Sequence, residues 1–346
     1  MRNEYDLLEK YLKLCSKENI INFKNIKRSK EPKVSVISPV YNKENYILRF
    51  IHSIQEQNFI DYEMILIDDF SEDKSVHLIK KFQEYDPRII LIKNKKNYGT
   101  FKSRNLGALK STGNFVIFPD PDDLLSKNSL RLFYNYATKY NYEMIRYNLY
   151  IGNQTLFMEG LIKQINCRPV FQPELSTYIF YGQGFLKQID FNLSNKLIKR
   201  IVYIKALNSL NKEYLNLHMT IFEDGLLNYV LYKFASSFFY LKKIGYYYIK
   251  SPNSVTKKNL DSQFIKAIFT HLNIVFELSK NNKYEKDMFN DIFNRICIKN
   301  NVTDLISQIN TESDFEFYMK TLNKFINNEF ININNKNYIL KLKNIL

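Results

Sequence analysis

The 346-residue sequence lacks tryptophan and is poor in cysteine, histidine, glycine and proline. Its cysteines, Cys15, Cys167 and Cys297, are widely spaced and odd in number, so neither a disulfide framework nor a zinc pattern can be built from them. No two of the four histidines stand at metal-ligand spacing. We therefore expect a reducing compartment, and a core that relies on Phe, Tyr, Ile and Leu.

Long apolar runs are also absent. The N-terminus lacks the apolar stretch of a signal peptide, and no run approaches the ~18 apolar residues of a membrane span. Neither G-x-G-x-x-G nor a Walker pattern occurs, which excludes dinucleotide oxidoreductases and P-loop NTPases. These absences predict a cytoplasmic protein.

The charge, by contrast, is strongly one-sided. Lys and Arg outnumber Asp and Glu by 50 to 35, a formal net charge of +15. Such a surface attracts anions such as nucleotides, lipid headgroups or nucleic acid. A solvated basic surface and peripheral contact with an anionic membrane are equally consistent with it.

Hydrophobic periodicity divides the chain into four parts. Residues 1–30 predict an amphipathic helix and a basic link, residues 31–150 alternate strands with helices, residues 151–256 are less regular, and residues 257–346 predict a helical appendage. Strands are expected at 34–38, 64–67, 89–92, 115–118 and 143–147, and helices at 44–55, 74–84, 102–110 and 129–140. This alternation predicts an α/β fold with a mostly parallel sheet and helices on both faces.

The strand predicted at 115–118 ends in a dense acidic segment, Asp120-Pro121-Asp122-Asp123. Flanking prolines hold the backbone extended and limit how far the carboxylates can spread. Such carboxylates repel one another unless a cation lies among them, and a hard divalent ion takes oxygen ligands. Because ligands of open α/β sheets bind at the carboxyl ends of strands, the segment predicts a metal-assisted site for a phosphate ester.

Two further polar segments follow predicted strands. The segment from Ser38 to Asn42 contains Pro39 and Tyr41 and is followed by Glu44. It suits either an ordinary turn or a loop that places the Tyr41 ring against a nucleobase. Asp68 and Asp69 end the second strand, where one carboxylate can accept hydrogen bonds from a base or ribose and another can cap the next helix.

Glycine and acidic residues mark two more candidate positions. Gly99 permits close approach of a phosphate, and Arg104 or Lys102 can neutralise it. Gly113 is expected to end the helix predicted at 102–110 as its C′ residue. Glu223 and Asp224 suit either a catalytic role or a capping box that begins at Thr220 and opens the next helix.

In their order and spacing these segments resemble the family 2 glycosyltransferases of the GT-A fold. The residues that carry the resemblance are Val34 to Asn42, Ile67 to Ser71, Asn97 to Gly99, Ser103 to Gly107 and Asp120 to Asp123. Looser similarity to the acceptor side of bacterial polysaccharide-type members follows in Asn195-Lys196-Leu197, Glu223-Asp224, Tyr246 to Tyr248 and Asn253-Ser254.

The resemblance implies an inverting, hexosyltransferase-type enzyme that uses a nucleoside diphosphate sugar, usually a UDP-sugar, with Mn²⁺ or Mg²⁺. The implied acceptor is a hydroxyl on a glycan, a lipid-linked sugar or a protein. The donor half would be residues 31–150 and the acceptor half residues 151–256.

The resemblance also implies residue roles. Pro39, Tyr41 and Asp69 would hold the base, with Glu44, Gly99 and Arg104 in the same nucleotide-sugar site. Asp120 and Asp122 would form the DXD signature that binds ribose, metal and diphosphate, although proline at position 121 is a less usual middle residue. Asp224 would be the general base.

Other interpretations of the residues stay open at this point. A nucleotidyltransferase also needs an acidic metal site on an α/β sheet. A basic nucleic-acid-binding protein would explain the charge, but it lacks a recognisable binding module and leaves the acidic segment unexplained. An inactive transferase that keeps only the fold is disfavoured by the intact acidic segment.

Overall fold

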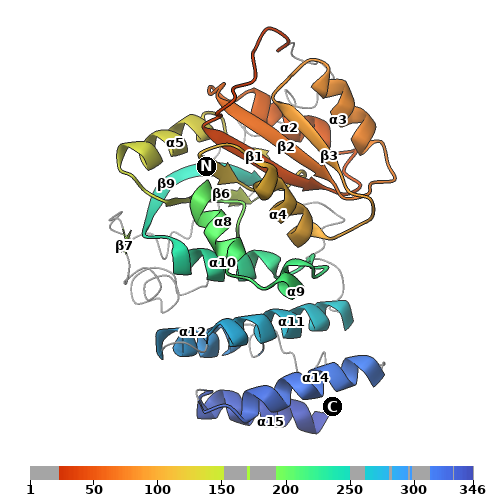
Figure 1. The fold of residues 1–346 in the computed structure, drawn as a ribbon, viewed down its shortest axis with the longest axis vertical. Helices are drawn as coiled ribbons and strands as arrows, with labels where there is room; N and C mark the ends of the chain where they lie inside the picture. Colours follow the sequence, from red (N-terminus) through yellow and green to blue (C-terminus); the bar gives the residue numbers. More distant parts are fainter. Residues whose placement is uncertain are drawn as a thin grey trace. The chain divides into compact units, whose positions relative to one another are not determined.

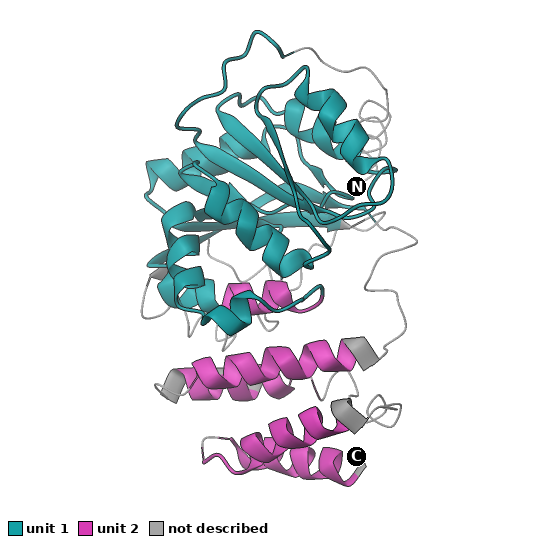
Figure 2. Ribbon diagram, turned by 45° about the vertical axis from the view of Figure 1, so that its right-hand side comes forward, with its two compact units in different colours: residues 1–175, 192–220, 230–251 teal, residues 176–191, 221–229, 252–346 magenta. Residues whose placement is uncertain are grey.

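The computed structural model describes residues 23–151, 170–171, 192–249, 262–279, 283–294, 297, 312–329 and 331–345 (Figure 1). The chain divides into two compact units, residues 1–175, 192–220 and 230–251 in the first, and residues 176–191, 221–229 and 252–346 in the second (Figure 2). The predicted N-terminal helix and a predicted turn at Gly152-Asn153 lie outside the described residues.

Four parallel strands build the first half of the sheet in the first unit. They are β1 (Val34–Val40), β2 (Tyr62–Asp68), β3 (Ile89–Lys93) and β4 (Phe115–Ile117), in the order β3-β2-β1-β4. Every residue of β1 and β2 is buried, as expected for strands covered on both faces. Because these strands are parallel, the segments that follow them all leave the same edge of the sheet.

The second half of the sheet is mixed. Beyond β4 lie β8 (Lys196–Lys199), β6 (Met144–Ile151), β9 (Ser237–Tyr248) and β5 (Leu124–Leu125), and β7 (Val170–Phe171) pairs with β9. β8 is antiparallel to both β4 and β6, and β9 is parallel to β6. The α/β prediction is confirmed, but β5, β7, β8 and β9 were not among the expected strands.

Helices cover both faces of the parallel strands. The first unit contains α2 (Ile47–Gln55), α3 (Ser75–Gln83), α4 (Thr100–Lys110), α5 (Ser129–Lys139), α8 (Arg200–Asn208) and α9 (Lys212–Leu215). Val34, Val36 and Val40 of β1 share one core with apolar residues of α2, α3 and α5. The opposite face packs against α4, where a Cβ on Gly107 would stand 2.4 Å from Ile37 and 2.6 Å from Ile67. Only glycine lets α4 approach the sheet this closely.

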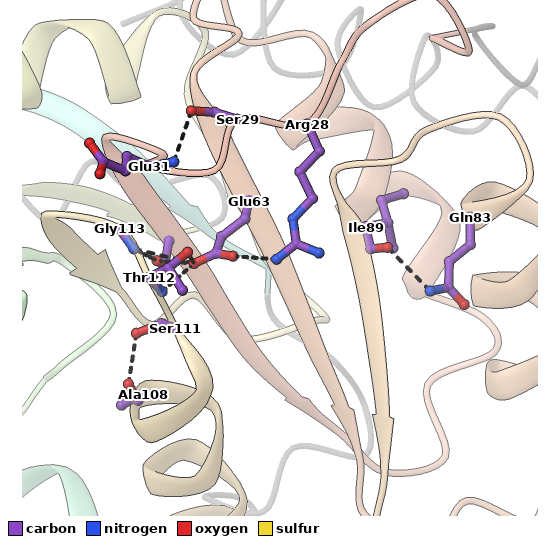
Figure 3. Close-up of polar contacts among 11 residues, drawn as sticks. Arg28, Ser29, Glu31, Glu63, Gln83, Ile89, Ala108, Ser111, Thr112 and Gly113 are labelled. Atoms are coloured by element: carbon purple, nitrogen blue, oxygen red, sulfur yellow. Dashed lines mark hydrogen bonds and ion pairs between the residues drawn. The ribbon is translucent and has the colours of Figure 1, made fainter.

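A buried carboxylate ties the amino-terminal edge of the sheet together (Figure 3). Glu63 of β2 is fully buried and accepts hydrogen bonds from Arg28 at 3.1 Å, Ser35 at 2.7 Å and the Thr112 backbone at 2.6 Å. α4 already ends at Lys110, so the expectation that Gly113 is its C′ residue is wrong. A Cβ on Gly113 would instead lie 2.5 Å from Ser35 Oγ, so close packing explains this glycine.

The described residues of the second unit are mainly helical, as predicted for the C-terminal part. Its helices are α11 (Ser262–Leu278), α12 (Lys283–Phe293), α14 (Glu312–Ile326) and α15 (Ile333–Ile345), drawn in magenta in Figure 2. The rings of Phe276, Phe289 and Phe325 meet pairwise between α11, α12 and α14, with centroids 4.9 to 5.3 Å apart. In the part of the chain that the structure describes, no helix combines the length and the apolarity needed to cross a bilayer.

Candidate active site

The loops that follow β1 and β2 are bonded to each other. The Asn42 N–H donates to Ser71 Oγ at 3.1 Å, and the Glu72 N–H donates to Asn42 Oδ1 at 2.9 Å. The Lys43 N–H donates to Ser75 Oγ at 2.8 Å. These reciprocal bonds lie at the carboxyl edge of the sheet and hold the two loops together as one unit.

The residues predicted to meet the nucleobase differ in exposure. Pro39 is buried within β1, while the Tyr41 side chain just after it is 47% exposed. Phe70, after β2, is 49% exposed and has a φ of 71°, a backbone region that costs a non-glycine residue energy. Glu44 accepts a hydrogen bond from the Lys74 N–H at 3.0 Å, so its carboxylate supports the start of α3. Tyr41 and Phe70 thus present two aromatic rings to solvent.

Asp69 is committed to the loop that follows β3. Its buried carboxylate accepts hydrogen bonds from Asn94 Nδ2 at 2.7 Å, from the Tyr98 N–H at 2.8 Å and from the Gly99 N–H at 2.8 Å. The structure therefore gives Asp69 a positioning role in the 94–99 loop. Direct contact with a base stays a prediction of the family resemblance.

Gly99 is the N-cap of α4 and is required by its conformation. Its φ is 85°, and a Cβ there would stand 3.0 Å from the Met219 carbonyl oxygen. Its N–H already points at Asp69 rather than outward, so the prediction that Gly99 approaches a phosphate is not tested by these contacts. The Met219 carbonyl also accepts a hydrogen bond from the Phe101 N–H at 3.0 Å, which joins the 216–219 segment to the start of α4.

The acidic segment after β4 lies among cations. Arg104 of α4, itself buried, donates to Asp120 at 3.2 Å. Lys43 forms an ion pair with Asp122 at 2.7 Å, and Arg49 of α2 donates to the Asp122 carbonyl oxygen at 2.7 Å. Three elements thus deliver positive charge to the two aspartates of the predicted signature.

The third aspartate of the segment is structural. Asp123 is buried and accepts hydrogen bonds from the Tyr246 hydroxyl at 2.6 Å and from the Ile249 N–H at 2.7 Å. Burial raises the pKa of Asp123 well above its ordinary value, and the charges of Asp120 and Asp122 raise it further. Tyr246 also accepts the Asp120 N–H at 3.0 Å, so β9 fixes the backbone of the acidic segment.

The donor set suits a divalent ion only in part. Asp120 and Asp122 offer carboxylate oxygens, and Mg²⁺ commonly binds one or two carboxylates together with phosphate oxygens. Within the described ranges, no group of three or more His, Cys, Asp or Glu side chains is arranged to hold a metal ion. The two aspartates therefore fit a metal whose remaining ligands come from a bound diphosphate and water.

Glu223 and Asp224 belong to the second unit and open α10 (Glu223–Phe234). A capping box that begins at Thr220 needs Glu223 as the third helical residue, but Glu223 is the first, so that alternative is wrong. Phe222, which precedes the helix, has a φ of 63°, and His271 of α11 lies 3.2 Å from its carbonyl oxygen. Asp224 is half-buried, and its role as general base stays a prediction.

Several residues of the site escaped the sequence analysis. Lys43, Arg49, Asn94 and Tyr246 all contact predicted residues but belong to none of the quoted motifs, apart from the looser similarity at Tyr246. The signal that could have found Lys43 is its place beside Tyr41 and Asn42, in a loop expected to face the acidic segment.

Comparisons with known proteins give the same family. The chain is 24% identical to "Glycosyltransferase GlyA" of Streptococcus pneumoniae over 314 residues, 86% of this chain and 42% of that protein. It is 35% identical to "Putative teichuronic acid biosynthesis glycosyltransferase TuaG" of Bacillus subtilis over 100 residues, 29% of this chain and 40% of that protein. The chain thus spans less than half the length of these relatives.

A solved structure shares the fold. The crystal structure of Staphylococcus aureus TarS 1–349 in complex with UDP-GlcNAc superposes with a TM-score of 0.65 at 18% identity, covering 90% of this chain and 88% of that one. This likeness supports the GT-A fold. The family model "Glycosyl transferase family 2" matches residues 35–207, half of the chain. The chain therefore belongs to glycosyl transferase family 2.

Proposed function

We propose that this protein is an inverting, metal-dependent glycosyltransferase that moves a sugar from a UDP-sugar to an acceptor hydroxyl. The observation that carries the proposal is the acidic segment at the carboxyl end of β4. There Asp120 and Asp122 lie among Arg104, Lys43 and Arg49. Acidic groups that hold a cation, surrounded by basic groups that hold an anion, suit a metal–diphosphate.

The nucleotide would enter along the carboxyl edge of the parallel strands. The exposed Tyr41 ring is available to stack on a base, and stacking on an aromatic ring contributes about 1–3 kcal/mol per base. Asp69 shapes the neighbouring 94–99 loop through its three hydrogen bonds. UDP is favoured as the nucleotide by the family resemblance and by the similar TarS structure, which was solved in complex with UDP-GlcNAc.

The chemical step separates the sugar from a nucleoside diphosphate whose negative charge grows. A divalent ion held by Asp120 and Asp122 would act as a Lewis acid toward that charge. Arg104 adds a buried guanidinium 3.2 Å from Asp120, and a preorganised cation of this kind stabilises developing charge. Asp224 accepts the proton of the acceptor hydroxyl as its oxygen attacks the anomeric carbon and the bond to the diphosphate breaks.

The acceptor is proposed to be a hydroxyl of a glycan, with lipid-linked sugars and proteins as the other candidates. The support comes from similar proteins, which include the TuaG protein above and "Poly(ribitol-phosphate) beta-N-acetylglucosaminyltransferase TarS" of Staphylococcus aureus, 32% identical over 101 residues.

A donor panel tests the proposal. The protein is incubated with UDP-, GDP-, CDP- and dTDP-sugars and Mn²⁺, and nucleotide release and thermal stabilisation are measured. We expect UDP-sugars to give both signals, and EDTA to abolish them. Preference for GDP or dTDP would refute the uracil assignment, and labelling by the nucleotidyl half of the substrate would favour a nucleotidyltransferase.

Two variants test the residue roles. Asp122→Asn should abolish transfer with the fold intact, because Arg49 and Tyr246 hold the backbone of the acidic segment without the Asp122 carboxylate. Asp224→Asn should bind UDP with Mn²⁺ normally yet lose at least ~100-fold in transfer if it is the base. Glu223→Gln is the matched control, since it changes the neighbouring carboxylate at the same helix start. Full turnover in Asp224→Asn would refute that role.

A further inference from the structure

The two aspartates of the acidic segment are paired with cations of different kinds. Asp120 faces Arg104, whose side chain is 1% exposed and is fixed within α4. Asp122 faces Lys43, whose side chain is 27% exposed and lies in the loop after β1. Arginine offers a rigid guanidinium, whereas lysine offers a compact ammonium on a flexible four-carbon stem. The Lys43 pair is therefore the one built to exchange partners.

The backbone of Lys43 is held by bonds that do not involve its side chain. Its N–H is bonded to Ser75 Oγ at 2.8 Å, so the loop itself stays in place. Its ammonium lies 5.6 Å from the centre of the Tyr46 ring, and Arg49 stacks on the same ring at 4.8 Å. A cation over an aromatic face is stabilised there. The Lys43 side chain can leave Asp122 without disturbing the loop.

We propose that Lys43 is a built-in counter-ion that occupies Asp122 Oδ2 in the nucleotide-free protein and yields this oxygen to the metal when a nucleoside diphosphate binds. The proposal rests on the proposed function, since it assigns Asp122 to the metal. The diphosphate supplies a new anionic partner for the displaced ammonium. Metal and nucleotide therefore bind together, and the nucleotide-free protein binds metal weakly.

The pair at 2.7 Å places the ammonium in direct competition with a divalent ion. Removing the Lys43 ammonium frees a carboxylate oxygen of Asp122. Among the described residues, the ammonium pairs with no other carboxylate. We expect Lys43→Met to tighten Mn²⁺ binding to the nucleotide-free protein by about tenfold, the change that corresponds to 1.4 kcal/mol.

Lys33→Met is the matched control. Lys33 also forms an ion pair with an aspartate, Asp61 at 3.1 Å, and its ammonium also lies 5.6 Å from a tyrosine ring centre, that of Tyr134. It stands just before β1, at the opposite edge of the sheet from the acidic segment. The control variant therefore loses the same charge and a similar set of contacts without freeing Asp122.

The experiment measures Mn²⁺ binding by calorimetry and by the electron paramagnetic resonance of free Mn²⁺, first without nucleotide. We expect tighter binding in Lys43→Met, less than a twofold change in Lys33→Met, and loss of the gain in Lys43→Met/Asp122→Asn. An affinity equal to wild type in Lys43→Met, or a gain that survives Asp122→Asn, would overturn the proposal. If methionine prevents folding, Lys43→Gln decides in the same way.

Repeating the titration with saturating UDP tests the exchange itself. We expect the advantage of Lys43→Met to disappear, because UDP draws the ammonium of the wild-type protein away from Asp122. An undiminished tenfold advantage with UDP would overturn the exchange. Failure of the proposed function would look different, because the wild-type protein would then release no nucleotide from any nucleotide sugar of the donor panel. The comparison of Mn²⁺ binding without nucleotide would still decide the role of Lys43.

Discussion

Asp69→Asn separates a structural role of this residue from direct recognition of the base. In the folded protein one carboxylate oxygen accepts from Asn94 Nδ2 at 2.7 Å and from the Tyr98 N–H at 2.8 Å, and the other accepts from the Gly99 N–H at 2.8 Å. Whichever way the new amide turns, its NH₂ group faces at least one of these donors. Because Asp69 is 3% exposed, water cannot replace the lost acceptor.

The magnitude follows from these contacts. A hydrogen bond to a charged group contributes about 1.5–3 kcal/mol, and an unsatisfied buried donor costs about 1–3 kcal/mol. We expect the free energy of unfolding of Asp69→Asn to fall by about 3 to 5 kcal/mol, and UDP–Mn²⁺ affinity to fall with it as the 94–99 loop loosens. Urea unfolding can be monitored by tyrosine fluorescence or circular dichroism, since the chain has no tryptophan. Calorimetry gives the affinity.

Asn94→Ala is the companion variant, because it removes one of the three bonds to Asp69, together with a bond to Ser103 Oγ, from a residue that the resemblance does not assign to the base. If Asp69 acts through the loop, the two variants weaken UDP binding in parallel, and the double variant costs less stability than the sum of the two. Loss of UDP binding in Asp69→Asn at unchanged stability would refute this account and establish a direct contact with the base.

Three further outcomes are expected. Burial lowers the pKa of His271 from 6.5 to about 4, so the stability that its neutral form contributes is present above pH 6.5 and is lost as the pH falls toward 4. We expect a loss of about 3 kcal/mol over that window, flattened in His271→Phe, and urea midpoints measured from pH 7 to pH 4 check it. Phe70→Gly should raise stability by about 1 kcal/mol by relieving a φ of 71°, whereas Phe70→Ala should give no such gain in the same urea assay. The side chains of Ile333 and Leu340 on the lysine-bearing α15 are 68% and 45% exposed, which favours peripheral binding to anionic membranes. Flotation with anionic but not neutral liposomes is expected, each nearby lysine adding about 1 kcal/mol, and equal recovery with both would contradict the membrane contact.

The parallel half of the sheet could be predicted because its strands are short apolar runs that end in polar residues. Val34–Val40 and Tyr62–Asp68 are buried along their whole length, so their sequences carry an unbroken apolar signal. Strand β9 carries no such signal, because Lys242 and Lys243 interrupt it and the sheet register shifts near Tyr147 and Asn148 of the paired strand. β5 and β7, of two residues each, are too short for any periodicity.

The positions of the acidic residues at the ends of the parallel strands could be predicted, and the contacts that these residues make could not. Asp120 and Asp122 stand at the strand end where the resemblance implies them, because that position depends only on β4. Two of the three partners of Asp69 are backbone N–H groups 29 and 30 residues away, and backbone groups leave no mark in a sequence. Lys43 meets Asp122 across 79 residues, and the only sign of this pairing in the sequence is the place of Lys43 beside Tyr41 and Asn42.

The bonds between the loops after β1 and β2 have a consequence for the engineering of donor preference. Asn42 and Ser71 hold the two loops to each other, so a change or an insertion at either position disturbs both loops at once. Tyr41 and Phe70 stand next to these residues, and their exposed rings make no aromatic contact within the described residues. If the proposed contact between Tyr41 and the nucleobase holds, a library varied at these two positions alone changes that contact while the bonded frame of the two loops stays intact.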